Sequence, residues 1–208
     1  MIFLSSILVC LTSTRFLPVQ HKVLDDASIQ LMLQGIEFEE RDSLIRFGRQ
    51  VFPAYFRILQ AKDTEWLHRV RIFGILSAVK GDRSQFVEIA VEHLTHSHAG
   101  VRQNAVRLLG EIGSTRDAAP VVALLSDQDW TVGIAAAKAL ALIGDQRTLQ
   151  AMDVWISTSA PRKDRNEQFD RSFRNDIAGY RDELKQRLEK AQSVRKPLAP
   201  PPRAVVKP

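Results

Sequence analysis

The sequence predicts an all-α protein, an α-solenoid (alpha-alpha superhelix) in which helix pairs stack side by side. Three observations predict this fold. The segment that begins at Leu94 overlays the segment that begins at Leu125, the apolar positions they share recur every three or four residues, and a glycine follows each run. That spacing is typical of one face of a helix, and fixed-period self-similarity is typical of a solenoid. Because a helix pair that buries one face needs a neighbour, the repeat predicts a stack.

The two overlaid segments are related by an offset of 31 residues. Seven positions are identical between them: Leu94/Leu125, Val101/Val132, Ala105/Ala136, Leu109/Leu140, Ile112/Ile143, Gly113/Gly144 and Arg116/Arg147. The matches from Val101 to Ile112 are spaced by 4, 4 and 3 residues, so they lie on one helical face. The small alanine in that face allows a neighbouring helix to approach closely. We expect Gly113 and Gly144 to end their helices as left-handed caps.

Each repeat unit is predicted to contain a second helix. Apolar stretches at 118–125 and 149–156 follow the two glycines. A looser copy of the unit lies upstream, because Val70 precedes Val101 by 31 residues and a further helix is expected from about residue 84 to 94. The unit is therefore a helix, a short turn and a second helix.

The first unit is more divergent. Pro53 follows Gly48 much as Pro120 follows Gly113, which places each proline in the first turn of a second helix, where its missing N–H is harmless. With residues 23–38 and the segment from residue 42 counted as part of this unit, the sequence predicts four helix pairs. We assign the solenoid to residues 23–158.

These repeats resemble the HEAT-like repeat of the phycobilisome (PBS) lyase type over roughly residues 48–156. The residues that carry the resemblance are Leu125, Asp127, Asp129, Val132, Ala136, Leu140, Ile143, Gly144 and, in the second helix, Pro120. The resemblance implies an armadillo-like helical solenoid that serves mostly as a protein-binding scaffold, although relatives include bilin lyases and other enzymes.

The chain departs from the usual repeat at three positions. Gly133 stands where the family usually has arginine, as Arg102 does one unit earlier, and His96 and His98 stand where aspartate is usual. These departures leave the fold prediction unchanged. They leave open whether the usual ladder of contacts between units forms.

Residues 159–193 are predicted to form a charged amphipathic helix. Its apolar positions recur every three or four residues in one narrow stripe: Phe169, Phe173, Ile177, Tyr180, Leu184 and Leu188. The stripe could pair with a second copy as a short coiled coil. It is too short for the three or four heptads that a coiled coil needs, so we expect it to dock on the chain's own solenoid.

The two ends of the chain are predicted to lie outside the solenoid. Residues 1–22 form an apolar N-terminal segment that is too short to span a bilayer; it is either a signal peptide or a segment that packs or frays. It lacks early basic residues and a small-residue cleavage site, so a cytoplasmic location is favoured over export. Residues 194–208 are proline-rich and basic, which predicts a disordered tail.

Charge and cysteine content exclude several classes of function. The net charge is +5, but Arg195, Lys196, Arg203 and Lys207 in residues 194–208 supply +4 of it, with no acid to offset them. The body of the chain is therefore almost neutral, so nucleic-acid binding is not favoured. A single cysteine, Cys10, excludes an internal disulfide, an iron–sulfur cluster and a thiolate zinc site.

Four residues are the candidates for binding a partner: Trp130, Arg102, His96 and His98. Large aromatic residues and arginine are enriched at interface hot spots, and Trp130 begins a predicted helix at a turn. His93, His96 and His98 could hold a transition metal. The repeat favours another role, because His96 and His98 align with Asp127 and Asp129 at the turn before a helix, where either residue type can accept from backbone N–H groups.

The sequence therefore predicts a non-enzymatic protein–protein interaction scaffold. No catalytic residue, no cofactor-binding residue and no metal site is predicted, and the expected partner is a protein. The alternatives are a bilin lyase or chaperone-like subunit, and a nucleic-acid-binding HEAT-like protein.

Overall fold

The computed structural model describes residues 24–35, 38–160 and 166–195, and these residues form helices and turns without strands. The α-helices are α1 (Asp26–Gln34), α2 (Phe38–Phe47), α3 (Phe52–Gln60), α4 (Trp66–Ala78), α5 (Val87–Glu92), α6 (Ala99–Ile112), α7 (Ala118–Ala123), α8 (Trp130–Ile143), α9 (Gln146–Thr158) and α10 (Glu167–Arg195). Short 3-10 turns flank α3, α5 and α7: η2 (Gly48–Val51), η3 (Ser84–Phe86), η4 (His93–Thr95), η5 (Thr115–Asp117) and η6 (Leu124–Ser126). The all-α prediction is confirmed.

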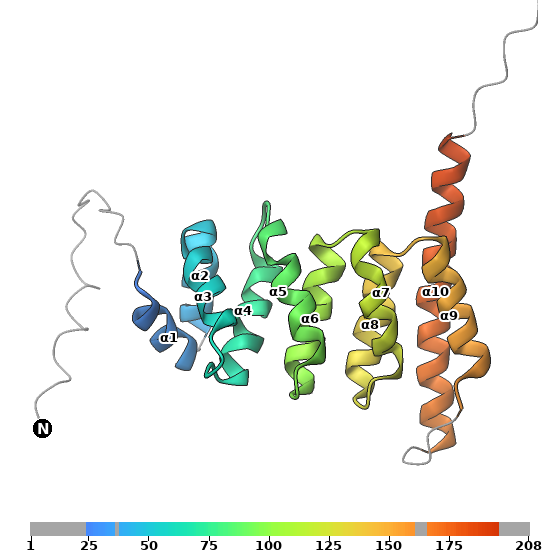
Figure 1. Ribbon diagram of the computed structural model, residues 1–208, viewed down its shortest axis with the longest axis horizontal. Coiled ribbons are helices and arrows are strands. Elements are labelled where there is room, and N and C mark those ends of the chain that lie inside the picture. Colours follow the sequence, from blue (N-terminus) through green and yellow to red (C-terminus); the bar gives the residue numbers. More distant parts are fainter. Residues whose placement is uncertain (1–23, 36–37, 161–165, 196–208) are drawn as a thin grey trace, which may run out of the picture.

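The helices are arranged along the long axis of the molecule from α1 at one end to α9 and α10, which lie side by side at the other end (Figure 1). Helices α4, α6, α8 and α10 pack against one another in succession and form a first layer. Helices α5, α7 and α9 follow them in the chain; α7 contacts both α8 and α9, and this second set forms a second layer. The solenoid prediction is confirmed.

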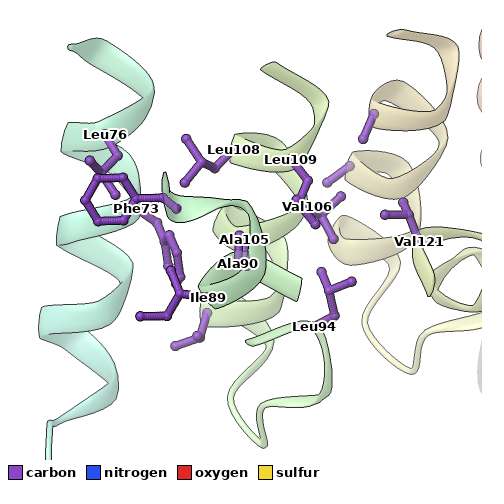
Figure 2. Close-up of a cluster of buried hydrophobic side chains, with 14 of the residues drawn as sticks. Phe73, Leu76, Ile89, Ala90, Leu94, Ala105, Val106, Leu108, Leu109 and Val121 are labelled. Atoms are coloured by element: carbon purple, nitrogen blue, oxygen red, sulfur yellow. The ribbon is translucent and has the colours of Figure 1, made fainter. Parts of the chain in front are cut away.

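The core runs continuously through the stack because each unit buries side chains against the next. Figure 2 shows Phe73 and Leu76 of α4 facing the side chains of α5 and α6, with Val121 of α7 on the far side. Helices α6 and α8 approach each other closely, since a Cβ on Gly110 would lie 3.0 Å from Ala139 Cα. The two helices can approach this closely because the residues at the contact, Gly110 and Ala139, are small.

The prediction of left-handed caps at Gly113 and Gly144 is wrong. Their φ angles are −77° and −66°, in the extended region. Glycine is required for a different reason: a Cβ at Gly113 would lie 2.6 Å from the Leu109 carbonyl oxygen that accepts its own N–H. The left-handed glycines are Gly48 (φ 55°) and Gly81 (φ 102°), which lie in the turns of the two preceding units.

Helix α10 closes the C-terminal end of the stack. It packs on both α8 and α9, and Phe173, Ile177 and Leu184 of its apolar stripe are buried in the common core. Arg187 of α10 also donates to the carbonyl oxygens of Ala141 (3.0 Å) and Gly144 at the end of α8. The stripe therefore docks on the chain's own solenoid, as the sequence favoured.

The observed helix α10 begins at residue 167 and ends at residue 195, two residues beyond the predicted end. Residues 161–165 between α9 and α10, the apolar segment 1–22 and the tail from residue 196 lie outside the described residues. The predictions on those segments stay predictions. Among the helices of the described residues, none combines the length and the apolar character that crossing a membrane requires.

Candidate interaction surface

The turn before α6 and the turn before α8 are built in the same way from different residues. Asp129 caps α8 by accepting the Thr131 N–H on Oδ1 (2.8 Å). His98 caps α6 by accepting the Gly100 N–H on Nδ1 (3.2 Å). This confirms the expectation that a histidine can replace the capping aspartate at this point of the repeat.

The position two residues earlier is also equivalent in the two turns. Asp127 Oδ1 accepts the Asp129 N–H at 2.9 Å, and His96 Nδ1 accepts the His98 N–H at 3.0 Å. Both histidines therefore use the unprotonated Nδ1 atom to hold a backbone donor. The two imidazole rings therefore accept the backbone N–H groups that the two aspartates accept in the next unit.

Arg102 joins these two turns across the units. Its Nε and Nη2 atoms donate to the two carboxylate oxygens of Asp127, at 2.8 and 2.6 Å. Its Nη1 atom donates to the carbonyl oxygens of His96 (2.8 Å) and Ser97 (3.0 Å). The bonds to the Asp127 carboxylate raise the pKa of Arg102, and only 14% of its side chain is exposed. The structure gives Arg102 an internal role as a bridge between turns.

The equivalent positions in the neighbouring units make no such bridge. Arg71 instead donates to the carbonyl oxygens of Leu33 and Gln34 at the end of α1. Gly133 has no side chain, and Phe173 of α10 fills its space, so that a Cβ there would lie 2.8 Å from Phe173 Cζ. In the unit before and the unit after Arg102, the equivalent position therefore contacts a flanking helix, α1 or α10, and does not bridge two turns.

Two tryptophans lie at helix starts and share the same exposed fraction. Trp130 is 46% exposed, and its ring meets Phe169 of α10 edge to face at 5.5 Å between centroids. Trp66, also 46% exposed, stacks on the His98 ring at 3.7 Å. Trp130 is the predicted candidate; Trp66 was not selected from the sequence, because its contact with His98 joins residues from different units.

A buried cationic side chain lies beside the histidines. Arg69 is 6% exposed and donates to the Ala61 carbonyl oxygen at 2.6 Å. Burial, together with the Arg69 charge, lowers the pKa of both His93 and His96, whose rings stack at 6.1 Å. His93 also holds the Ile89 carbonyl oxygen through Nδ1 at 2.7 Å. The neutral imidazole is therefore favoured in the folded protein.

The histidines are not gathered as a set of metal ligands. His93, His96 and His98 each direct Nδ1 at a backbone group within four residues in the chain. Over the ranges 24–35, 38–160 and 166–195, no group of three or more potential ligands is placed to hold a metal ion.

A hollow of about 450 Å³ lies on the second layer, between α7 and α9. Its walls are Thr115, Arg116, Ala118, Ala119, Val122, Asp145, Arg147, Thr148 and Ala151. We call this hollow the α7–α9 groove. Arg116 and Arg147 occupy equivalent positions of the repeat, a match that the sequence contains but that was not read as part of a site.

Two further hollows lie elsewhere. One, of about 350 Å³, lies where the turn before α8 meets α10 and includes Trp155, Asp170, Phe173 and Arg174 in its walls. A smaller one, of about 90 Å³, lies on the first layer between α6 and α8, beside Arg107 and Lys138. The candidate residues Arg102, His96 and His98 line none of these three hollows, and neither does Trp130.

The repeat geometry from α5 onward agrees with a comparison against protein families. Residues 87–167 match HEAT repeats. The match begins at the first residue of α5 and ends at the first residue of α10. These HEAT repeats therefore include the Arg102 bridge and the α7–α9 groove. No curated protein matches the sequence.

Proposed function

We propose that this protein is a non-enzymatic scaffold that binds a protein partner through the second layer of its HEAT repeats. The observation that carries the proposal is the α7–α9 groove, an open hollow of about 450 Å³ between two helices of the second layer. Pockets of about 300–1,000 Å³ hold whole small molecules, so this hollow is large enough to take side chains of a partner. HEAT repeats expose such extended surfaces because each unit contacts only its neighbours.

The four predicted residues fit this proposal in different ways. Trp130 is exposed at the turn edge and remains a candidate contact. Arg102, His96 and His98 hold the turns together, so we propose that they shape the surface rather than bind the partner directly.

Affinity capture with the full chain tests the proposal. The bait is incubated in lysate of its own source with nuclease added, and the retained proteins are quantified by mass spectrometry. Ala119→Trp fills the exposed α7–α9 groove, and Lys138→Trp places the same bulk on the first layer. We expect a stoichiometric partner that the Ala119→Trp bait loses and the Lys138→Trp bait keeps.

Two outcomes would contradict the proposal. If only nucleic acid or a pigment copurifies, the protein is not a protein-binding scaffold. If the Lys138→Trp bait loses the partner and the Ala119→Trp bait keeps it, binding uses the first layer. Trp130→Ala and the equally exposed Trp66→Ala show in the same assay whether Trp130 contributes.

The finer resemblance to the phycobilisome lyase type stays a proposal from the sequence. A bilin lyase or chaperone-like subunit would carry visible absorbance after co-expression with a tetrapyrrole source. A nucleic-acid binder would stay on heparin after removal of the basic residues 194–208. We favour neither, because the sequence offers no residue that identifies a bilin site, and because the chain outside residues 194–208 is almost neutral.

A further inference from the structure

The α7–α9 groove is lined in part by apolar side chains. Ala118, Ala119 and Ala151 contribute methyl groups, and Val122 adds a branched side chain. Val154 lies one helical turn after Ala151 on α9, outside the lining of the groove, and is 59% exposed. Residues three apart on a helix share a face, so Val154 continues the apolar surface along α9. Covering this exposed apolar surface with a side chain of a partner would remove it from water, which is favourable for binding.

Two arginines also line the groove. Arg116 and Arg147 are both exposed, and they stand one repeat apart on η5 and α9. Neither guanidinium makes a hydrogen bond or ion pair with another residue of the described ranges. Two cationic groups at matched positions are thus available to a ligand.

The two carboxylates near these arginines are turned toward the backbone. Asp117 Oδ2 accepts from the Ser114 N–H (2.8 Å) and hydroxyl (2.9 Å). Asp145 Oδ1 accepts from the Thr148 N–H (2.9 Å) and hydroxyl (3.1 Å). The bond from the Thr148 N–H is the main reason why the pKa of Asp145 is lowered, with Arg147 adding a smaller effect. Both aspartates cap local turns, and the arginine heads face solvent.

We propose that the α7–α9 groove binds an acidic, amphipathic segment of the partner protein. Its carboxylates pair with Arg116 and Arg147, and its apolar side chains cover the alanines and Val154. Arginine recognises carboxylates through two parallel hydrogen bonds, and an amphipathic helix in an apolar groove is a recurring mode of peptide recognition. This inference rests on the proposed scaffold function and adds the chemistry of the partner.

The undescribed ends of this chain do not have the chemistry of that segment. Residues 1–23 and 196–208 contain no aspartate or glutamate, and both carry basic residues. Neither segment offers an acidic side chain to Arg116 or Arg147. The two exposed arginines therefore favour an acidic segment of a partner protein as the occupant.

Peptide selection on the full-length protein tests the inference. The probe is a displayed library of random peptides of about 12 residues, roughly three helical turns. Selection on the wild-type protein is followed by fluorescence-anisotropy titration of the enriched peptides. We expect peptides with aspartate or glutamate next to apolar residues, and binding that weakens as salt is added.

A charge reversal and its matched control locate the site. Arg116→Glu combined with Arg147→Glu should weaken the enriched peptides about tenfold or more, because attraction becomes repulsion at two positions. Arg107→Glu combined with Lys138→Glu makes the same change in net charge on the first layer and should leave binding unchanged. Both pairs consist of exposed side chains, and circular dichroism checks that every variant stays folded.

The inference is overturned by any of three results: no peptide is enriched, the enriched peptides are neutral or basic, or both double variants weaken binding equally. These results are distinct from failure of the scaffold proposal. A partner captured from lysate through the second layer, together with a failed peptide selection, would keep the scaffold and reject the acidic segment.

Discussion

Phe173 of α10 occupies the space that a side chain at Gly133 of α8 would need, with 2.8 Å between its Cζ atom and the position of the missing Cβ. The preceding unit has Arg102 at this position of the repeat, and Arg102 bridges two turns. The absence of a side chain at position 133 therefore leaves room for Phe173 and for the packing of α10 on α8. In this chain, glycine at this position of the repeat marks the unit on which α10 packs.

Gly133→Arg should destabilise the protein, because the larger side chain displaces Phe173 from its site. Overpacking of this kind costs about 1–3 kcal/mol of the free energy of unfolding. Urea denaturation followed by circular dichroism measures the change. Gly179→Ala on α10, where no atom lies within 4 Å of an added Cβ, is the control and should stabilise by about 0.5–1 kcal/mol. An unchanged midpoint for Gly133→Arg would show that α10 does not depend on this contact.

Arg102→Gln should strongly destabilise the HEAT repeats, because it leaves the Asp127 carboxylate without its bidentate partner in a turn where 6% of the Asp127 side chain is exposed. Breaking a buried pair from one side costs about 3–5 kcal/mol. A double-mutant cycle with Asp127→Asn should show a coupling energy well above that of the exposed pair Arg171–Glu167, where about 0.5 kcal/mol is expected. Equal coupling in the two cycles would contradict a bridging role.

Stability should fall as the pH drops below about 6.5, the ordinary pKa of histidine. Burial lowers the pKa of His93 and His96 in the folded protein, so the unfolded chain binds protons that the folded chain excludes. By linkage, the free energy of unfolding then decreases on acidification. The stability that comes from the neutral histidines is fully present above that pH. Urea midpoints at pH 7.5 and 5.5 measure the effect.

His96→Asp provides the matched comparison for this pH effect. The equivalent residue one unit later is Asp127, which accepts the same backbone N–H, so the turn should be kept. The variant should lose part of the difference between the two pH values, since a carboxylate does not titrate in this interval. A variant with the full wild-type difference would assign the effect to other groups.

Leu184→Ala should destabilise by about 2–5 kcal/mol, the usual range for a leucine truncated in a core. Leu184 lies on the highly charged helix α10, and its side chain is fully buried against the end of α8. Val194→Ala near the end of α10, where the valine is 79% exposed, should change stability by less than about 0.5 kcal/mol. Thermal denaturation of both variants measures the contrast. Similar small effects would mean that α10 does not close the stack.

The sequence predicted the helix pairs well because the matching residues form a strong local signal. Spacings of 4, 4 and 3 between Val101 and Ile112 specify a helical face without knowledge of what covers it. The roles of His96 and His98 were also predictable, because the aligned aspartates identify a capping turn. These inferences depend only on residues within one unit.

The conformation of Gly113 and Gly144 was less predictable. A glycine after a helix can be needed because the backbone adopts a positive φ angle or because there is no space for a Cβ. The sequence is the same in both cases. The bridging contacts of Arg102 were not predictable for a related reason. An arginine at a turn can face a partner or a neighbouring unit, and only the placement of Asp127 shows that it faces inward.

The α7–α9 groove could not be derived from spacing. Its existence depends on how far apart two helices of the second layer lie, which side-chain sizes alone do not determine. The repeat does contain one signal, the identity of Arg116 and Arg147. In an alignment of two units, identical core residues and an identical pair of surface residues look alike. Burial in the structure distinguishes them, because Ala105 and Ala136 are buried and the two arginines are exposed.

Hydrogen–deuterium exchange of the full chain, with and without the partner isolated by affinity capture, tests the scaffold account most directly. Amides protected by a partner exchange more slowly, and the protected peptides locate the contact. The account predicts slower exchange in α7, in α9 and in the turns at their starts, with α6 and the exposed face of α8 unchanged. Protection confined to α6 and α8, or found nowhere in the HEAT repeats, would contradict it.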